Sequence, residues 1–63
     1  MNKERKQRIE ITIGELENVL EEEDEIRDNM PENLQNSSRY EESEAASENL
    51  QTAIDALYEI VNY

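Results

Sequence analysis

The chain contains no cysteine and no histidine among its 63 residues. The lack of cysteine excludes disulfides and thiolate metal sites, and the lack of histidine removes the commonest metal ligand and the commonest general base. A chain of this length buries little core and usually relies on disulfides, a metal or self-association. Self-association is the route that this composition leaves open, so we expect an oligomer with no cofactor and no metal site.

Long apolar runs and basic residues are also scarce. No apolar stretch approaches the ~20 residues that a membrane span requires, and no signal-peptide core follows the basic start, so we expect a cytoplasmic protein that does not enter a membrane. Residues 1–8 carry four basic residues against Glu4, whereas residues 9–63 carry two against sixteen acids. The net charge of −11 repels nucleic acid phosphates. We therefore expect no direct nucleic acid binding, and any protein partner should be basic.

There is one proline and one glycine, and the proline divides the chain. Pro31 has no N–H and disfavours a helical conformation at Met30, so a first helix should end between Asp28 and Met30. Ser38, followed three residues later by Glu41, has the pattern of a capping box that starts a second helix. The sequence predicts a single all-α domain over 1–63, an antiparallel helical hairpin with helices at about 3–29 and 38–62 and a hinge at 30–37.

Apolar residues recur at spacings of three and four in both predicted helices, which indicates amphipathic helices. One register of the first helix, from Ile9 through Thr12, Leu16, Val19, Glu23 and Ile26 to Met30, makes Glu23 a candidate buried or half-buried acid. Both apolar stripes are wider than one neighbouring helix can cover, so we expect two hairpins to pair as a homodimeric four-helix bundle. The predicted core and dimer residues are Ile9, Ile13, Leu16, Val19, Leu20, Ile26, Leu50, Ile54, Leu57 and Val61.

Gly14 interrupts the first helical pattern at a cost of roughly 1 kcal/mol relative to alanine. It either marks a close helix crossing or lies on the surface.

The acidic residues allow one catalytic interpretation. Glu22-x-x-Glu25 followed by Glu41-x-x-Glu44 resembles the paired carboxylate motifs with which all-α nucleotide pyrophosphohydrolases hold magnesium. The last acid is an aspartate in that family, and no basic or aromatic nucleotide pocket accompanies the motif here. A magnesium-dependent pyrophosphohydrolase-like bundle is thus a remote alternative. The serines have no histidine to activate them, so we expect no catalytic residue and no enzyme.

A solvated acidic face explains the acid clusters better, and it could steer a basic protein towards the chain. The predicted partner-binding residues are Glu21, Glu22, Asp24, Glu25, Glu41, Glu42, Glu44 and Glu48. The sequence therefore predicts a non-enzymatic acidic interaction protein. The alternative is a self-assembling structural module that has no separate ligand, in which the acids serve solubility alone.

The run from Glu21 to Gln35, together with Ser38-Arg39-Tyr40-Glu41 and the helical segment Ala53 to Leu57, resembles an uncharacterised family of short acidic helical proteins. These proteins occur in Gram-positive bacteria, their phages and integrative elements. The resemblance covers about residues 20–61, its most specific part is the hinge sequence Asp-Asn-Met-Pro-Glu-Asn-Leu-Gln, and Tyr40 stands where the family pattern has glycine. It implies a phage or mobile-element context, and it supplies no activity, catalytic residue or ligand. In that context, the predicted interaction protein would be an accessory factor that binds a basic surface of a host protein.

Overall fold

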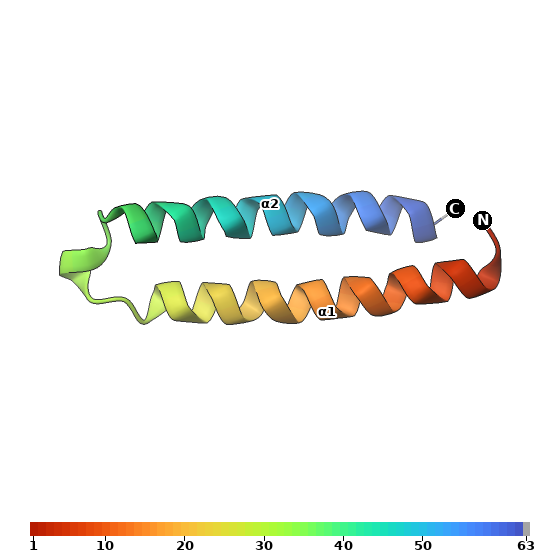
Figure 1. Cartoon of the computed structure of the whole chain (residues 1–63), viewed down its shortest axis with the longest axis horizontal. Coiled ribbons are helices and arrows are strands. Elements are labelled where there is room, and N and C mark those ends of the chain that lie inside the picture. The colour runs from red at the N-terminus through yellow and green to blue at the C-terminus, as the bar shows by residue number, and fades with distance from the viewer. Residues whose placement is uncertain (63) are drawn as a thin grey trace.

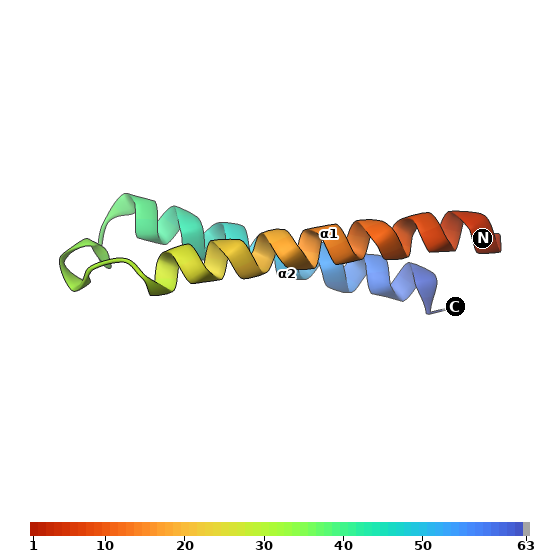
Figure 2. The same cartoon turned by 90° about the horizontal axis from the view of Figure 1, so that it is seen from below.

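The chain folds as two long antiparallel helices joined by a short hinge (Figure 1). The computed structural model describes residues 1–62. Helix α1 covers Lys3–Asp28, the 3-10 helix η1 covers Glu32–Leu34, and helix α2 covers Ser38–Val61. The predicted all-α hairpin is confirmed, and each helix ends one residue before its predicted last residue. Figure 2 shows that the two helices cross at a shallow angle and that both termini lie at the end opposite the hinge.

Helix α2 begins at Ser38, as predicted, but its N-cap lies one residue before the serine that the sequence indicates. The N-cap is Ser37, whose Oγ accepts a hydrogen bond from the Tyr40 N–H at 3.3 Å. The Ser37 hydroxyl in turn donates to the Leu34 carbonyl at 2.6 Å, which links the cap to η1. Ser38 is therefore the first helical residue, and the predicted capping box with Glu41 does not form. Ser37 is favoured because its hydroxyl serves both the helix and the hinge.

The hinge is an ordered turn. Pro31 has an extended backbone with φ −59° and ψ 149°, as expected for a residue that ends one helix and leads into another. Three backbone bonds follow it, from Leu34 N to Pro31 O at 2.9 Å, from Gln35 N to Glu32 O at 3.2 Å and from Ser37 N to Leu34 O at 3.1 Å. The side chain of Leu34 nevertheless stays 46% exposed.

The apolar core of the hairpin is small. Among the described residues, the buried apolar side chains are Ile13, 2% exposed, and Ile54, 1% exposed. Val19 and Ile26, which the sequence places in the core or the dimer interface, are 46% and 58% exposed and do not belong to the core of a single hairpin. The other predicted core residues are half-buried: Ile9, Leu16, Leu20, Leu50, Leu57 and Val61.

The shape of the molecule explains the small core. The Cα atoms span 49 × 14 × 12 Å with a radius of gyration of 14.7 Å, against roughly 11 Å for a compact domain of this length. The accessible surface is 5007 Å², whereas a compact monomer of this mass exposes roughly 4,200 Å². The single hairpin is a rod that leaves much more surface in water than a folded domain of its size.

Gly14 lies in the middle of α1, and a Cβ atom built on it meets nothing within 4 Å. Within one hairpin, Gly14 therefore does not mark a close helix crossing. We expect Gly14→Ala to raise the free energy of unfolding by about 1 kcal/mol, because alanine restricts the unfolded backbone and favours a helix. Thermal and urea unfolding followed by circular dichroism measure the change.

The matched control for this substitution is Ala45→Gly, at an exposed position of α2, which should lower the free energy of unfolding by a similar amount. A lower melting temperature for Gly14→Ala would contradict the expectation, and it would mean that another surface reaches Gly14 in the assembled protein.

Candidate functional site

The hinge half of the interface between α1 and α2 is polar. Arg27 reaches from α1 to two serines of α2 that are 5% and 9% exposed, Ser43 and Ser47. Its Nη1 atom donates to Ser47 Oγ at 2.8 Å, to Ser43 Oγ at 3.1 Å and to the Ser43 carbonyl at 3.2 Å. Its Nη2 atom donates to Asp24 Oδ1 at 2.7 Å. The Arg27 guanidinium therefore donates hydrogen bonds to residues of both helices.

The two serine hydroxyls extend these contacts back to α1. Ser47 Oγ donates to Asp24 Oδ1 at 2.7 Å, and Ser43 Oγ donates to Glu23 Oε2 at 2.7 Å. Glu23 is therefore half-buried, as predicted, and hydrogen-bonded. We call Glu23, Asp24, Arg27, Ser43 and Ser47 the Arg27 network. Over residues 1–62, no buried side-chain nitrogen or oxygen lacks a hydrogen-bond partner, so the network is complete as a polar layer.

The network shifts the pKa of its charged members. The hydrogen bond from Ser47, followed by that from Arg27, lowers the pKa of Asp24 below 3.8. The hydrogen bond to Asp24 raises the pKa of Arg27. Asp24 therefore stays ionised and Arg27 stays charged at neutral pH, as the network requires.

The sequence identified Glu23 as an acid at the helix interface but did not identify Arg27. A signal was present, since Arg27 lies seven residues after Leu20 and so continues the stripe that faces α2. Ser43 and Ser47 are four residues apart on one face of α2, and antiparallel pairing through the hinge brings that face to Arg27. A charged residue on one helix opposite two small hydroxyl residues on the other indicates a hydrogen-bonded layer rather than an apolar one.

One side of the hairpin gathers acidic residues from both helices. From α1, Glu17, Glu21, Asp24, Glu25 and Asp28 line a hollow with Leu20, and Gln51 of α2 completes it. Gln51 donates to Asp55 at 3.0 Å. Glu44 and Glu48 precede Gln51 by seven and three residues and share its side of α2, and Glu41 lies seven residues before Glu48. The acidic flank comprises Glu17, Glu21, Asp24, Glu25, Asp28, Glu41, Glu44, Glu48 and Asp55.

The residues predicted to form the acidic face do not all lie on one surface. Six of its residues belong to the acidic flank: Glu21, Asp24, Glu25, Glu41, Glu44 and Glu48. Glu22 is exposed outside the acidic hollow, and Glu42 lies on the opposite side of the hairpin. Sequence reasoning missed Glu17, Asp28 and Asp55, because clusters of consecutive acids conceal the helical side on which each residue lies.

Tyr58 closes the acidic flank towards the termini. Its hydroxyl donates to the two carboxylate oxygens of Glu17 at 3.3 and 3.4 Å. The negative charge of Glu17 is the main cause that raises the pKa of Tyr58, and partial burial adds to it. This contact joins α1 and α2 at the end of the flank farther from the hinge.

The opposite side of the hairpin carries a stripe of mostly apolar residues from both helices, with charged residues beside it near the hinge. A hollow near the hinge is lined by Glu23, Ile26 and Met30 of α1 and by Arg39, Glu42, Ser43 and Ala46 of α2. Thr12 and Val19 precede Ile26 by fourteen and seven residues, and Ala53 and Ile60 follow Ala46 at the same spacing, so all four continue this side. The apolar flank comprises Thr12, Val19, Ile26, Met30, Ala46, Ala53 and Ile60. Ile60 is 38% exposed, and Val19 and Ile26 more so.

The carboxylates of the pyrophosphohydrolase-like motif do not form a site. Glu22, Glu25, Glu41 and Glu44 are all exposed. Within residues 1–62, no three acidic side chains lie where they could hold a metal ion together.

No protein-family model, curated protein or solved structure matches this chain. The resemblance to the short acidic helical proteins therefore stays a prediction. In the part of the chain that the structure describes, neither helix is long and apolar enough to cross a membrane.

Arg27→Met tests the network, because methionine keeps an unbranched side chain without the donors. We expect a lower melting temperature, since the partly buried acceptors lose a charged donor. The pKa of Asp24 should rise only in part, because the Ser47 bond remains. A lowered folded-state pKa supplies stability above about pH 3.8 that is lost as the pH falls through the folded-state value. The difference in melting temperature between the wild-type chain and Arg27→Met should therefore become smaller at acid pH.

Nuclear magnetic resonance titration of the Asp24 carboxyl and thermal unfolding at several pH values measure both effects. Arg39→Met is the matched control, because it removes the same charge from an exposed position near the hinge. Equal losses of stability in the two variants would show that charge, and not the network, is responsible.

Proposed function

We propose that the chain is a non-enzymatic interaction protein that pairs through its apolar flank into a homodimeric four-helix bundle and binds a basic protein surface with its acidic flank. A phage or mobile-element accessory factor is the context that its resemblance implies. The observation that carries the proposal is the division of the hairpin into two chemically different sides. One side needs a partner to cover it, and the other is suited to water and to positive charge.

The acidic flank supports binding to a basic protein. Its nine acids come from both helices, and the hollow at its centre is lined by five carboxylates and no basic side chain. Like charges on rigid helices raise the local potential and attract a cationic surface from a distance. Arg27 is the nearby cation, but its guanidinium already bonds to Asp24 and the two serines. Arg27 therefore reduces the net negative charge near the flank, but its guanidinium does not occupy the acidic hollow.

The apolar flank supports the homodimer. The Ile13 and Ile54 side chains alone are a small core for a chain of this size, and a bundle of four helices would bury the exposed residues of the flank. The accessible surface exceeds that of a compact monomer by roughly 800 Å², which is about what one partner buries in a stable protein interface.

A self-assembling module with no further ligand is the second candidate, and the apolar flank favours it equally. The two candidates differ only in whether the acidic flank has a partner. The arrangement of the carboxylates gives the pyrophosphohydrolase alternative no support.

The acidic flank is tested by changing Glu21, Glu25, Glu44 and Glu48 together to glutamine. Glutamine keeps helix propensity and size while it removes charge. A basic protein captured by the wild-type chain from a Gram-positive host lysate at low salt should be lost with this variant, and its affinity for the purified partner should fall by at least roughly tenfold.

The control for this variant removes four charges elsewhere, with Glu4, Glu15, Glu22 and Glu32 changed to glutamine. It should keep the partner, since none of these four residues belongs to the acidic flank. If neither the wild-type chain nor the control variant captures a basic partner, the binding function is contradicted and self-assembly is the better account. If both variants lose the partner equally, net charge rather than the flank is what binds.

The dimer is tested by Val19→Glu, which places a charge on the apolar flank. Sedimentation equilibrium should show a dimer for the wild-type chain and a shift towards monomer for the variant. The free energy of unfolding of the dimer should fall by about 1.5 to 3 kcal/mol per copy, because the apolar burial of one valine is lost in each copy. Both quantities are measured at micromolar protein concentration.

The matched control is Ile11→Glu. Ile11 is 64% exposed and lies outside both flanks, so this variant should remain a dimer. A wild-type chain that sediments as a folded monomer would contradict the dimer, as would a Val19→Glu protein that behaves like the Ile11→Glu control.

A further inference from the structure

The charge of the hairpin is divided along its length as well as between its sides. Residues 17–54, which form the hinge half, hold twelve acids and two arginines. Residues 1–16 and 55–62 form the other half, and they hold five acids and four basic residues. The hinge half therefore carries −10 of the net charge of −11.

Two symmetric arrangements could bring two apolar flanks together. With both hinges at the same end, α1 of one copy stacks on α2 of the other, and the two acidic hinge halves meet. With the hinges at opposite ends, α1 stacks on α1 and α2 on α2, and each acidic hinge half meets the half of its partner that holds the basic residues. Like charges in contact disfavour the first arrangement, and opposite charges favour the second.

We infer that the apolar flank receives a second copy of this chain in the antiparallel arrangement, with the hinges at opposite ends of the bundle. This inference rests on the proposed homodimer and specifies its orientation. When two copies of α1, Lys3–Asp28, overlap along their full length, the twofold axis passes between Glu15 and Leu16. Residues that are equally distant from that point then face each other across the interface.

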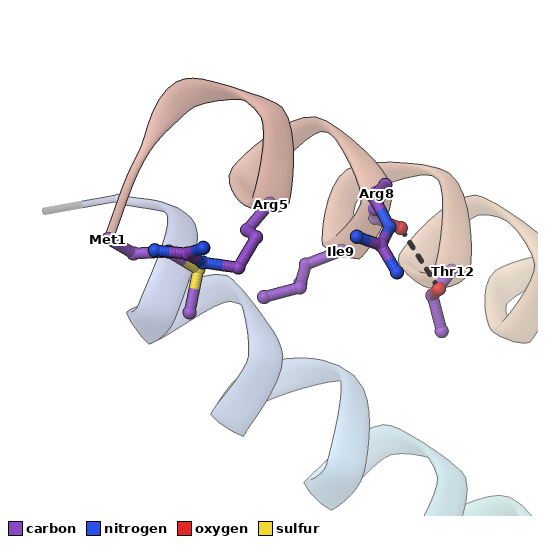
Figure 3. Close-up of a pocket in the computed structure, with 5 residues that line it drawn as sticks. All are labelled: Met1, Arg5, Arg8, Ile9 and Thr12. Atoms are coloured by element: carbon purple, nitrogen blue, oxygen red, sulfur yellow. Dashed lines mark hydrogen bonds between the residues drawn. The ribbon is translucent and has the colours of Figure 1, made fainter.

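The side chains on this side of α1 match under that symmetry. A second hollow, near the termini, is lined by Met1, Arg5, Arg8, Ile9 and Thr12. Figure 3 shows the Arg5 and Arg8 side chains on either side of Ile9. The twofold places Arg8 opposite Glu23, Thr12 opposite Val19, Met1 opposite Met30 and Arg5 opposite Ile26 of the second copy. The hollow near the termini of one copy thus meets α1 residues of the hinge hollow of the other.

The pairs that result are chemically suited to each other. Arg8 brings positive charge to Glu23, whose carboxylate already accepts a hydrogen bond from Ser43. The Thr12–Val19 and Met1–Met30 pairs are apolar, apart from the Thr12 hydroxyl, which donates to the Arg8 carbonyl of its own helix at 3.0 Å. In the Arg5–Ile26 pair, the methylene groups of the arginine side chain can cover the isoleucine. A displacement of α1 by three residues would bring Arg5 instead of Arg8 opposite Glu23, but it would place Met1 opposite Arg27 and leave Met30 beyond the end of the partner. The apolar pairs therefore decide between these two registers.

Disulfide cross-linking tests the arrangement directly, because the chain has no cysteine of its own. In the double variant Thr12→Cys/Val19→Cys, the thiol at position 12 of one copy should face the thiol at position 19 of the second copy. Mild oxidation should convert most of the protein into a covalent dimer on a non-reducing gel. The two cysteines of one chain lie about 10 Å apart along the helix, which is too far for a disulfide within the chain.

The matched control is Ile11→Cys/Asn18→Cys, which has the same spacing at nearly the same level on an exposed side of α1. It should remain mostly uncross-linked. If sedimentation shows a dimer but Thr12→Cys/Val19→Cys gives no more covalent dimer than this control, the antiparallel arrangement is overturned while the homodimer stands. A wild-type chain that is a folded monomer overturns both.

A second measurement uses charge. Arg8→Glu should raise the dimer dissociation constant by roughly tenfold, because it places a carboxylate against Glu23 of the second copy. Lys3→Glu makes the same charge change at the same end, outside the hollow that contains Arg8, and should change the dissociation constant much less. Equal effects of the two substitutions would overturn the pairing of Arg8 with Glu23.

Discussion

A helix in a hairpin has one neighbour, and this constraint governs the whole molecule. Each helix can bury one stripe of side chains against the other, so any apolar residue outside that stripe stays in water. In this chain the stripe accommodates Ile13 and Ile54 fully and several leucines in part, whereas Val19 and Ile26 remain exposed beside it. The small core, the rod shape and the exposed apolar residues on which the proposed dimer rests all derive from the same geometric limit.

The stripe itself changes character along its length. Near the termini it is apolar, and near the hinge it is the hydrogen-bonded layer around Arg27. An apolar layer tolerates sliding, whereas the guanidinium contacts Ser43, Ser47 and Asp24 only in one register of the two helices. The apolar half therefore supplies burial, and the polar half fixes how α1 and α2 align. The cap at Ser37 adds to this alignment, because its hydroxyl connects the start of α2 to the hinge.

The sequence predicted the fold well because the decisive signals are local. Pro31 ends one helix through its own covalent structure, and the three- and four-residue spacings define which faces are apolar. The N-cap was misplaced by one residue because Ser37 and Ser38 are chemically identical and only the contact with Leu34 distinguishes them. Arg27 was missed for a related reason: its partners lie sixteen and twenty residues away, and their proximity depends on the pairing of the helices.

The acidic surface was predictable in composition but not in layout. Glu21, Glu22, Glu23, Asp24 and Glu25 are consecutive, yet a helix turns each of them by about 100° relative to the last. The run therefore supplies the acidic flank, the Arg27 network and the apolar side with one or more carboxylates each. Residues that no local cluster marked, such as Glu17, join the flank because they share its side.

A chain with a net charge of −11 can associate with itself only if the charge is kept away from the contact. The division into two flanks keeps negative charge away from the contact, since most acids of the hinge half lie on the acidic flank or on outer faces. The division along the helix axis reduces repulsion between the copies, because an antiparallel partner brings the four basic residues at the start of α1 to the acidic hinge half. In the proposed dimer, these two divisions together leave the acidic flanks of both copies on the outside of the bundle. The charge that would oppose association is then directed towards solvent, where a basic partner would meet it.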